Sequence, residues 1–271
     1  MKLINYKDMS KLINIAIATA KIKSLEIPHR KIRPFMHLLL YGRIGGGKST
    51  ILWDVANKLN AVPIMNLTRA TLIGTVDKTT GNFIPPAVWD ARNSVLLIDE
   101  LFIDRNSPER GMLRNLLTLM ENPYFEKRMG YRCNDFKEGN MNDLYCVVEK
   151  NIIKCKTRFV FFANTMQNLE KTQMIELHSL KTRCLTIPYY PSLEDTIRKA
   201  KGEPFFVYQK LKCDGDIKIS KRTYNKIMKF TEDKNITVEH YLRTIGNLCR
   251  AYAVVGFDKK IFDLICDLAT I

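Results

Sequence analysis

The chain has 271 residues and a formal charge of +15, from 43 Lys and Arg against 28 Asp and Glu. This length holds one large domain or two small ones, and the 46% apolar fraction excludes a disordered chain. The longest apolar runs, such as Val95–Ile98 and Phe159–Ala163, are far shorter than the ~20 residues of a transmembrane helix. We therefore expect a soluble globular protein with no membrane partner.

The seven cysteines favour free thiols over disulfides or a metal site. Their number is odd and no two form a C-x-x-C pair. Three of them, Cys133, Cys146 and Cys155, are loosely grouped, but no histidine lies near them. This pattern predicts a reducing compartment, which we expect to be the cytoplasm of a cell or host.

Residues 1–34 form the most basic part of the chain, with eight basic and two acidic residues. The apolar stretch Leu12–Ala20 follows three lysines, as in a signal peptide, but it is short and Lys21 and Lys23 end it abruptly. We interpret residues 1–34 as a basic helical N-terminal segment.

The strongest motif begins at residue 42. An apolar segment, Met36–Tyr41, predicts a buried strand, and Ile51–Leu59 has helical character. Between them lies the pattern G-x-x-x-x-G-K-[ST], in the strand-to-helix context that a phosphate-binding loop requires. Glycines let backbone N–H groups surround phosphates, Lys48 adds a full charge, and the Ser49 hydroxyl can ligate Mg²⁺. The motif predicts ATP and Mg²⁺ as cofactors, and its candidate binding residues are Gly42, Gly45, Gly46, Gly47, Lys48, Ser49 and Thr50.

A second apolar strand, Ser94–Ile98, ends in Asp99 and Glu100. Successive side chains of a strand point in opposite directions, so the two carboxylates have different surroundings. Asp99 is the candidate Mg²⁺ ligand, through water, and Glu100 the candidate group that orients the attacking water. A core strand followed by two solvated acids remains the alternative.

Two further segments complete an ordered set. The strand Arg158–Ala163 ends in Asn164, an amide suitably placed beside a γ-phosphate and its attacking water. Next, the segment Leu180–Pro188 places Arg183 directly before another apolar strand.

From Met36 to Pro191, this set of motifs resembles an AAA+ ATPase. Residues 42–49 resemble Walker A, Val95–Glu100 resembles Walker B, Asn164 resembles sensor 1, and Arg183 resembles the arginine of the family's S-R-[CF] motif. The resemblance implies an α/β fold, the P-loop NTPase three-layer sandwich, with a five-stranded parallel sheet in the order 5-1-4-3-2 and a small helical lid. It also implies a homo-oligomer, a hexameric ring or spiral, in which Arg183 reaches the ATP of a neighbouring subunit. The nucleotide-binding core would cover residues 35–191.

Residues 122–157 are an insertion in this core, with two possible strands around a turn at Gly139–Asn140. The insertion, together with Leu72–Trp89, resembles the clade that has a hairpin before sensor 1, such as minichromosome-maintenance and viral replication helicases. In that clade hairpin lysines grip DNA, which makes Lys150, Lys154 and Lys156 the candidates here. The alternative is a basic surface loop.

Residues 192–271 resemble the helical lid. Ser192 to Asp195 predicts a capping box, and helices are expected over 220–230 and 238–254. The family's sensor 2 arginine lies early in the third lid helix, where Arg243 is the first candidate and Arg250 the second. Either could instead be an arginine on a helix surface.

The leading functional hypothesis is an ATPase that acts on single- or double-stranded DNA in replication initiation, unwinding or helicase loading, and that could itself be a DNA helicase. A small lysine-rich chain of this kind would suit a virus or plasmid. The alternative is a protein-remodelling AAA+ ATPase that threads polypeptide past an aromatic residue, for which Tyr124-Phe125 is the candidate. A nucleotide kinase or a non-motor nucleotide-binding protein is a third hypothesis, against which the Asp99-Glu100 pair and Asn164 argue.

Overall fold

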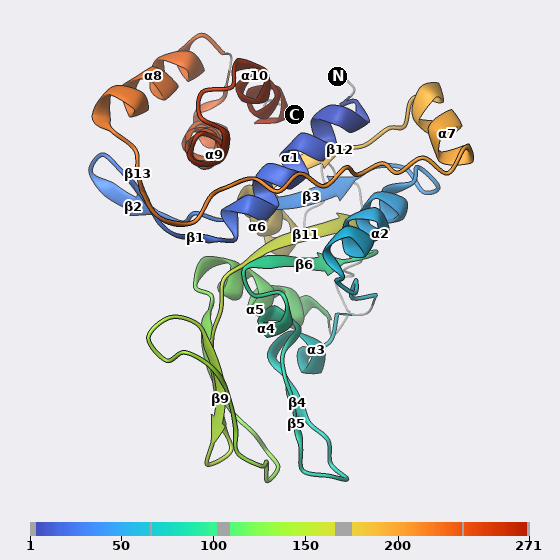
Figure 1. Ribbon diagram of the computed structural model, residues 1–271, viewed down its shortest axis with the longest axis vertical. Coiled ribbons are helices and arrows are strands. Elements are labelled where there is room, and N and C mark those ends of the chain that lie inside the picture. The colour runs from blue at the N-terminus through green and yellow to red at the C-terminus, as the bar shows by residue number, and fades with distance from the viewer. Residues whose placement is uncertain (1–3, 66, 102–108, 166–174, 235, 270–271) are drawn as a thin grey trace.

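The computed structural model describes residues 4–65, 67–101, 109–165, 175–234 and 236–269 (Figure 1). A four-stranded parallel sheet forms its centre. Its strands are, in spatial order, β12 (Cys184–Pro188), β3 (His37–Tyr41), β11 (Phe159–Thr165) and β6 (Ser94–Ile98). Every residue of β3, β11 and β12 is buried, as in parallel sheets covered on both faces. In the numbering of the expected fold, β12, β3, β11 and β6 are strands 5, 1, 4 and 3, so their order agrees with the first four places of 5-1-4-3-2.

The fifth expected strand is reduced, in the described residues, to a single bridge. Ile64 pairs in parallel with Ile98, and its N–H and C=O bond to Leu97 and Asp99. On either side, Val62 is 84% exposed and Met65 is 51% exposed. Among the described residues of this segment only Ile64 is anchored to the sheet, so the expected five strands are corrected there to four strands and a bridge.

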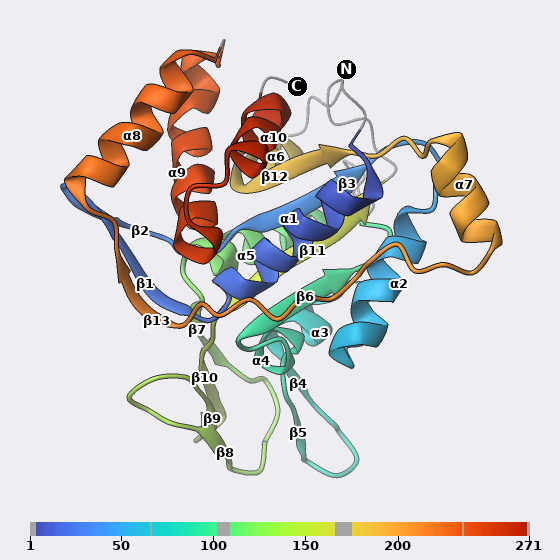
Figure 2. The same cartoon turned by 45° about the horizontal axis from the view of Figure 1, so that its top comes forward.

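Alternate residues of each strand supply two separate cores, which makes a three-layer α/β/α sandwich. One face, with Leu38 and Leu40 of β3, packs against α1 (Tyr6–Thr19), α2 (Lys48–Leu59), α9 (Val238–Val255) and α10 (Lys259–Ala269). The other face, with Leu39 and Tyr41, packs against α3 (Arg69–Ile73), α4 (Ala87–Asp90), α5 (Glu109–Glu121) and α6 (Ile175–Arg183). Figure 2 shows α1 lying across the sheet.

The N-terminal segment is only partly helical. After α1, residues form β1 (Ile22–Ile27) and β2 (Arg30–Ile32), joined by a tight turn in which His29 has a φ of 80°. β1 also pairs in parallel with β13 (Gly215–Lys218). The helical prediction for residues 1–34 is therefore corrected over 22–32, where pairing with β2 and with a strand almost 200 residues away decides the structure.

The remaining C-terminal elements are mostly helical. Ser192 and Asp195 form the capping box of α7 (Leu193–Ala200), and Ser220 caps α8 (Lys221–Glu232). Helices α8, α9 and α10 pack on one another, and α9 also packs on α1.

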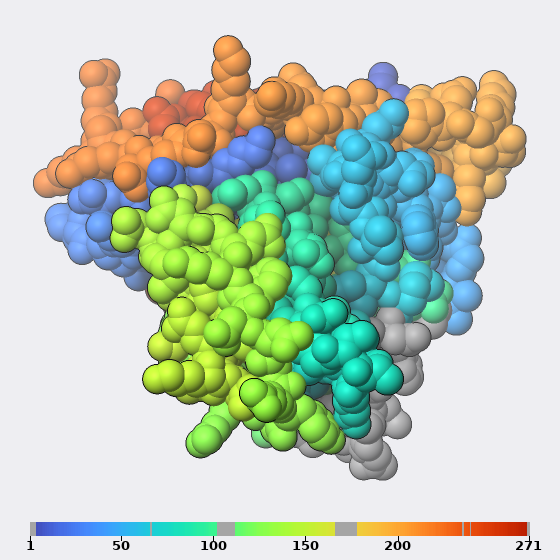
Figure 3. All heavy atoms as spheres, turned by 60° about the horizontal axis from the view of Figure 1, so that its bottom comes forward, coloured from blue at the N-terminus to red at the C-terminus, as the bar shows by residue number. Residues whose placement is uncertain are grey.

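The insertion is a four-stranded antiparallel sheet that projects from the core. Its strand order is β7 (Tyr124–Arg128), β10 (Ile152–Lys156), β9 (Tyr145–Glu149) and β8 (Phe136–Gly139). A smaller hairpin, β4 (Thr75–Val76) with β5 (Phe83–Ile84), projects beside it, as Figure 3 shows. The two are packed together: the Phe83 and Phe136 rings are 5.1 Å apart.

Within the described residues, no helix combines the length and apolar character needed to cross a membrane. All seven cysteines are buried free thiols.

Candidate active site

The loop between β3 and α2 has the backbone of a phosphate cradle. A Cβ on Gly42 would lie 2.3 Å from the Tyr189 carbonyl oxygen, so no larger residue fits there. Gly47 is the N-cap of α2 in a left-handed conformation and makes no side-chain cap. The first N–H groups of α2 therefore have no side-chain partner at the N-cap, which is the usual geometry of an anion site at a helix N-terminus.

Lys48 begins α2, and only 5% of it is exposed. Its ammonium donates hydrogen bonds to the carbonyls of Gly42 (2.9 Å) and Arg43 (2.7 Å). Burial lowers the pKa of Lys48, and the negative charges of Glu100 and Asp99 act against that shift. The carbonyls thus hold the ammonium at the loop, where it can instead donate its hydrogen bonds to phosphate oxygens.

Asn164 connects the phosphate loop to the carboxylates at the end of β6. Its side-chain amide donates to Asp99 Oδ1 (2.5 Å) and to Ser49 Oγ (3.4 Å). Its Oδ1 accepts the backbone N–H of Glu100 (2.6 Å). The parallel pairing of β11 with β3 and β6 brings these residues together, since all three strands end at the same edge.

Asp99 and Glu100 differ in exposure, as strand alternation predicts. Asp99 is 2% exposed, whereas Glu100 is exposed and has a φ of 56°, in the left-handed region that a glutamate rarely adopts. Strained backbone of this kind is typical of functional positions, and the hydrogen bond to Asn164 stabilises it. The conformation leaves the Glu100 carboxylate facing solvent at the phosphate loop.

These groups fit ATP and Mg²⁺. Glycines keep the cradle open where a Cβ would fill it, and Lys48 supplies the charge for the phosphates. Ser49 and Asp99 provide the hard oxygen ligands that Mg²⁺ prefers. The rest of the predicted loop, Gly45, Gly46 and Thr50, lies in the same turn and first helical residues.

Two residues at this site carry no motif and were missed by sequence reasoning. Trp53 of α2 donates its indole N–H to Asp99 Oδ2 (3.1 Å). Lys199 of α7 reaches the phosphate loop, where a Cβ on Gly47 would lie 3.4 Å from its Nζ. No local signal could have found Lys199, because the fold alone brings α7 back over the loop.

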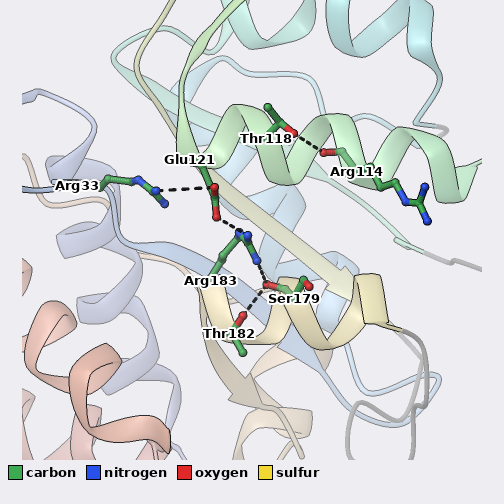
Figure 4. A network of polar contacts seen from close by, with 7 residues as sticks. All are labelled: Arg33, Arg114, Thr118, Glu121, Ser179, Thr182 and Arg183. Carbon is green, nitrogen blue, oxygen red and sulfur yellow. Dashed lines mark hydrogen bonds and ion pairs between the residues drawn. The ribbon is translucent and has the colours of Figure 1, made fainter.

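Arg183 lies at the opposite end of the sheet. It directly precedes β12, whose first residue, Cys184, pairs with His37 at the start of β3, whereas the phosphate loop follows the end of β3. The Arg183 guanidinium pairs with Glu121 and donates to the Ser179 carbonyl (2.9 Å), as Figure 4 shows. Arg33 approaches the same Glu121 at 3.9 Å.

An arginine-rich cavity of about 390 Å³ lies at this end of the sheet. Among the residues that the structure describes, six cationic side chains and no carboxylate line it, although Glu121 pairs with two of the six. The six are Arg30, Lys31, Arg33, Arg183, Arg243 and Arg250. Burial and the charge of Arg33 lower the pKa of Arg250 to about 10, while the neighbouring Cys249 acts against this shift. We call this feature the arginine cavity.

The two sensor 2 candidates both lie in the arginine cavity and away from the phosphate loop of their own chain. Arg243 donates to the Lys181 carbonyl (2.8 Å). Arg250 donates to the Arg33 carbonyl (2.9 Å) and to Asn247 Oδ1 (2.8 Å). The structure thus groups Arg183 with Arg243 but separates both from Lys48.

The three hairpin lysines are spread along the insertion. Lys150 is exposed in the tight turn between β9 and β10, where it and Asn151 both have positive φ. Lys154 is half-buried in β10, and Lys156 is exposed where β10 returns to the core. The predicted turn at Gly139–Asn140 joins β8 to β9, so the outer turn is instead the one with Lys150.

Comparison with known proteins identifies one family. The model described as "ATPase family associated with various cellular activities (AAA)" matches residues 38–178, more than half of the chain. The matched range includes Lys48, Asp99, Glu100 and Asn164. The chain has no match among the curated proteins.

Proposed function

This chain belongs to the AAA family of ATPases, and from that premise we propose that it hydrolyses ATP at sites shared between copies in a ring or spiral and acts on DNA. One observation carries the shared site: the phosphate loop and Arg183 lie at opposite ends of the sheet. The five residues of β3 separate those ends by about 16 Å. Arg183 is therefore out of reach of phosphates held by its own chain, but a head-to-tail neighbour would bring its phosphates to Arg183.

Each residue at the phosphate loop has a distinct role in this proposal. Lys48 leaves the two loop carbonyls and donates to the phosphates, while Asp99 and Ser49 hold Mg²⁺. Bound Mg²⁺ would supply neutralisation of the phosphate charge. Glu100 orients the attacking water and accepts its proton, and Asn164 keeps Glu100 in place through the backbone.

The arginine cavity supports the shared site. Glu121 pairs with Arg183 and Arg33, but the six cations of the lining still carry an excess of positive charge, and a multiply charged anion relieves their mutual repulsion. Guanidinium groups match phosphate oxygens in bidentate geometry. We therefore assign Arg183 to transition-state stabilisation in the neighbour's site and Arg243 to the same site as sensor 2, with a hexamer as the expected ring.

The DNA part of the proposal rests on charge and shape. The chain carries +15, and the projecting insertion places an exposed Lys150 at its outer turn. The neighbouring β4–β5 hairpin adds Lys78, whose ammonium lies 4.8 Å from the Tyr131 ring. Basic projections of this kind suit a phosphate backbone, as in the clade with a hairpin before sensor 1. Replication initiation, unwinding or helicase loading is the corresponding task.

The protein-remodelling alternative depends on Tyr124-Phe125. Both residues are half-buried at the base of the insertion, and Phe125 packs against three apolar clusters. A residue that grips polypeptide needs a free ring at a projecting end, so this packing favours DNA.

Measuring ATP turnover with and without DNA tests the proposal. We expect single- or double-stranded DNA to raise turnover at low salt, and the effect to fall steeply as salt rises. Lys150→Ala should weaken the stimulation, and Lys201→Ala at the C-cap of α7, far from the insertion, serves as the control. If turnover at low salt is unchanged by either form of DNA, the DNA part of the proposal fails.

A further inference from the structure

Trp53 is an unusual neighbour for a buried carboxylate. It lies on α2, five residues after Lys48, and 42% of it is exposed. Its indole N–H nevertheless points inward and donates to Asp99 Oδ2 at 3.1 Å. The ring thus joins the helix that begins at the phosphate loop to the end of β6.

Asp99 has both carboxylate oxygens fixed as a result. Oδ1 accepts the Asn164 amide at 2.5 Å, and Oδ2 accepts the Trp53 indole. A carboxylate can accept about four hydrogen bonds, so two acceptor positions remain for waters of a bound metal. The two donors fix the plane of the carboxylate and thereby decide where those free positions point.

We propose that Trp53 is a positioning residue for Mg²⁺, which acts by holding Asp99, and that its indole reports Mg²⁺–nucleotide binding. The proposal rests on the ATP and Mg²⁺ site described above. Partners that orient a metal's ligands contribute about 10- to 100-fold to metal affinity. Asn164 alone would leave Asp99 free to rotate, so losing the indole N–H should weaken Mg²⁺ binding and leave metal-free nucleotide binding intact.

The second tryptophan supplies a matched control. Trp89 also donates its indole N–H to a carboxylate, Glu138 Oε2 at 2.9 Å, but this pair joins α4 to the insertion. Each tryptophan therefore donates its indole N–H to a carboxylate, one at the phosphate loop and one at the insertion, and the sequence contains only these two tryptophans. Each Trp→Phe variant removes one N–H donor and one of the two emission signals while keeping an aromatic ring.

The experiment titrates Mg²⁺ into wild type, Trp53→Phe and Trp89→Phe, each saturated with a non-hydrolysable ATP analogue. Nucleotide affinity is measured by calorimetry in EDTA and in Mg²⁺, and circular dichroism checks that each variant is folded. We expect Trp53→Phe to raise the half-saturating Mg²⁺ concentration about tenfold, with unchanged affinity in EDTA. The Mg²⁺-dependent change in tryptophan emission should persist in Trp89→Phe and disappear in Trp53→Phe.

A folded Trp53→Phe protein with wild-type Mg²⁺ dependence, or with the emission change retained, overturns the proposal. Failure of the ATP site itself gives a different result, because wild type would then bind no nucleotide and Lys48→Ala would change nothing. If Trp53→Phe does not fold, Trp53→His, which keeps a ring N–H, is compared with Trp53→Leu, which has no donor. Trp53→Leu should then need about tenfold more Mg²⁺ for half-saturation than Trp53→His.

Discussion

The two ends of the central sheet both present cations to phosphate, but they do so in different ways. At the phosphate-loop end, Lys48 is buried beside Asp99 and Glu100, and glycine backbone forms the cradle. In the described part of the chain, the lining of the arginine cavity at the other end has six cations and no carboxylate. One end is balanced for Mg²⁺ chemistry, whereas at the other Glu121 offsets only part of the positive charge. This excess of positive charge is what we expect of a surface that receives the phosphates of a neighbouring copy.

The largest expected effect comes from the arginine end. Arg183→Ala should lower ATP turnover on the order of 10³- to 10⁵-fold, the range seen for arginines that stabilise phosphoryl-transfer transition states. Nucleotide affinity should change far less than turnover, since a group that stabilises the transition state acts mainly on the chemical step. Steady-state turnover and calorimetry measure the two quantities. Unchanged turnover in a folded Arg183→Ala protein would remove Arg183 from the shared site and break the distinction between the ends.

Glu100→Gln tests the other end. The amide keeps the shape of the side chain but cannot accept the water's proton, so turnover should fall about 10²- to 10⁴-fold. ATP should still bind, because Lys48 and the glycine cradle are intact. Glu26→Gln on β1, which pairs with Lys218 far from the site, is the control. Near-normal turnover in Glu100→Gln would remove this residue from its role.

His37 makes the arginine end sensitive to acid. Its Nδ1 accepts the Phe161 N–H (3.0 Å). Burial and the charges of Arg250 and Arg33 lower the pKa of His37 from 6.5 to about 3, while a hydrogen bond with the Met120 backbone acts in the opposite direction. The unfolded chain therefore takes up this proton first, so the free energy of unfolding falls as pH drops below 6.5.

The expected loss between pH 7 and pH 5 is about 2 kcal/mol from this group. His37→Gln, which can keep the acceptor, should lose less stability over that range, as measured by denaturant unfolding at each pH. His240→Gln on α9 is the control. An equal pH dependence in wild type and His37→Gln would show that His37 does not set it.

The smallest expected effect is at Lys199. Its ammonium is exposed above Gly47, where solvent screens it, so Lys199→Ala should weaken ATP binding only about threefold, and less at high salt. Lys201→Ala, two residues on, is the matched control. Equal ATP affinities for the two variants would leave Lys48 as the cation that matters at this end.

Residues that act within one contiguous stretch were predictable, and those that depend on distant contacts were not. The strand, glycine turn and helix around Lys48 follow from local sequence. The four strands of the central sheet were likewise predictable, because each is a short apolar segment. The pairing of β1 with β13, the contact of Lys199 with Gly47, and the gathering of Arg33, Arg183 and Arg250 depend on tertiary packing. The insertion lies between these cases: its turn at Gly139–Asn140 was predictable, but its four-stranded sheet was not.

Mixing two inactive variants tests the central claim most directly. Lys48→Ala removes the phosphate cation and Arg183→Ala removes the group offered to the neighbour. In a head-to-tail assembly of equal parts, about a quarter of the interfaces regain both residues. The account predicts that ATP turnover returns in part on mixing and that neither variant alone is active. Two inactive proteins that stay inactive when mixed, although they assemble together, would contradict a site shared between copies.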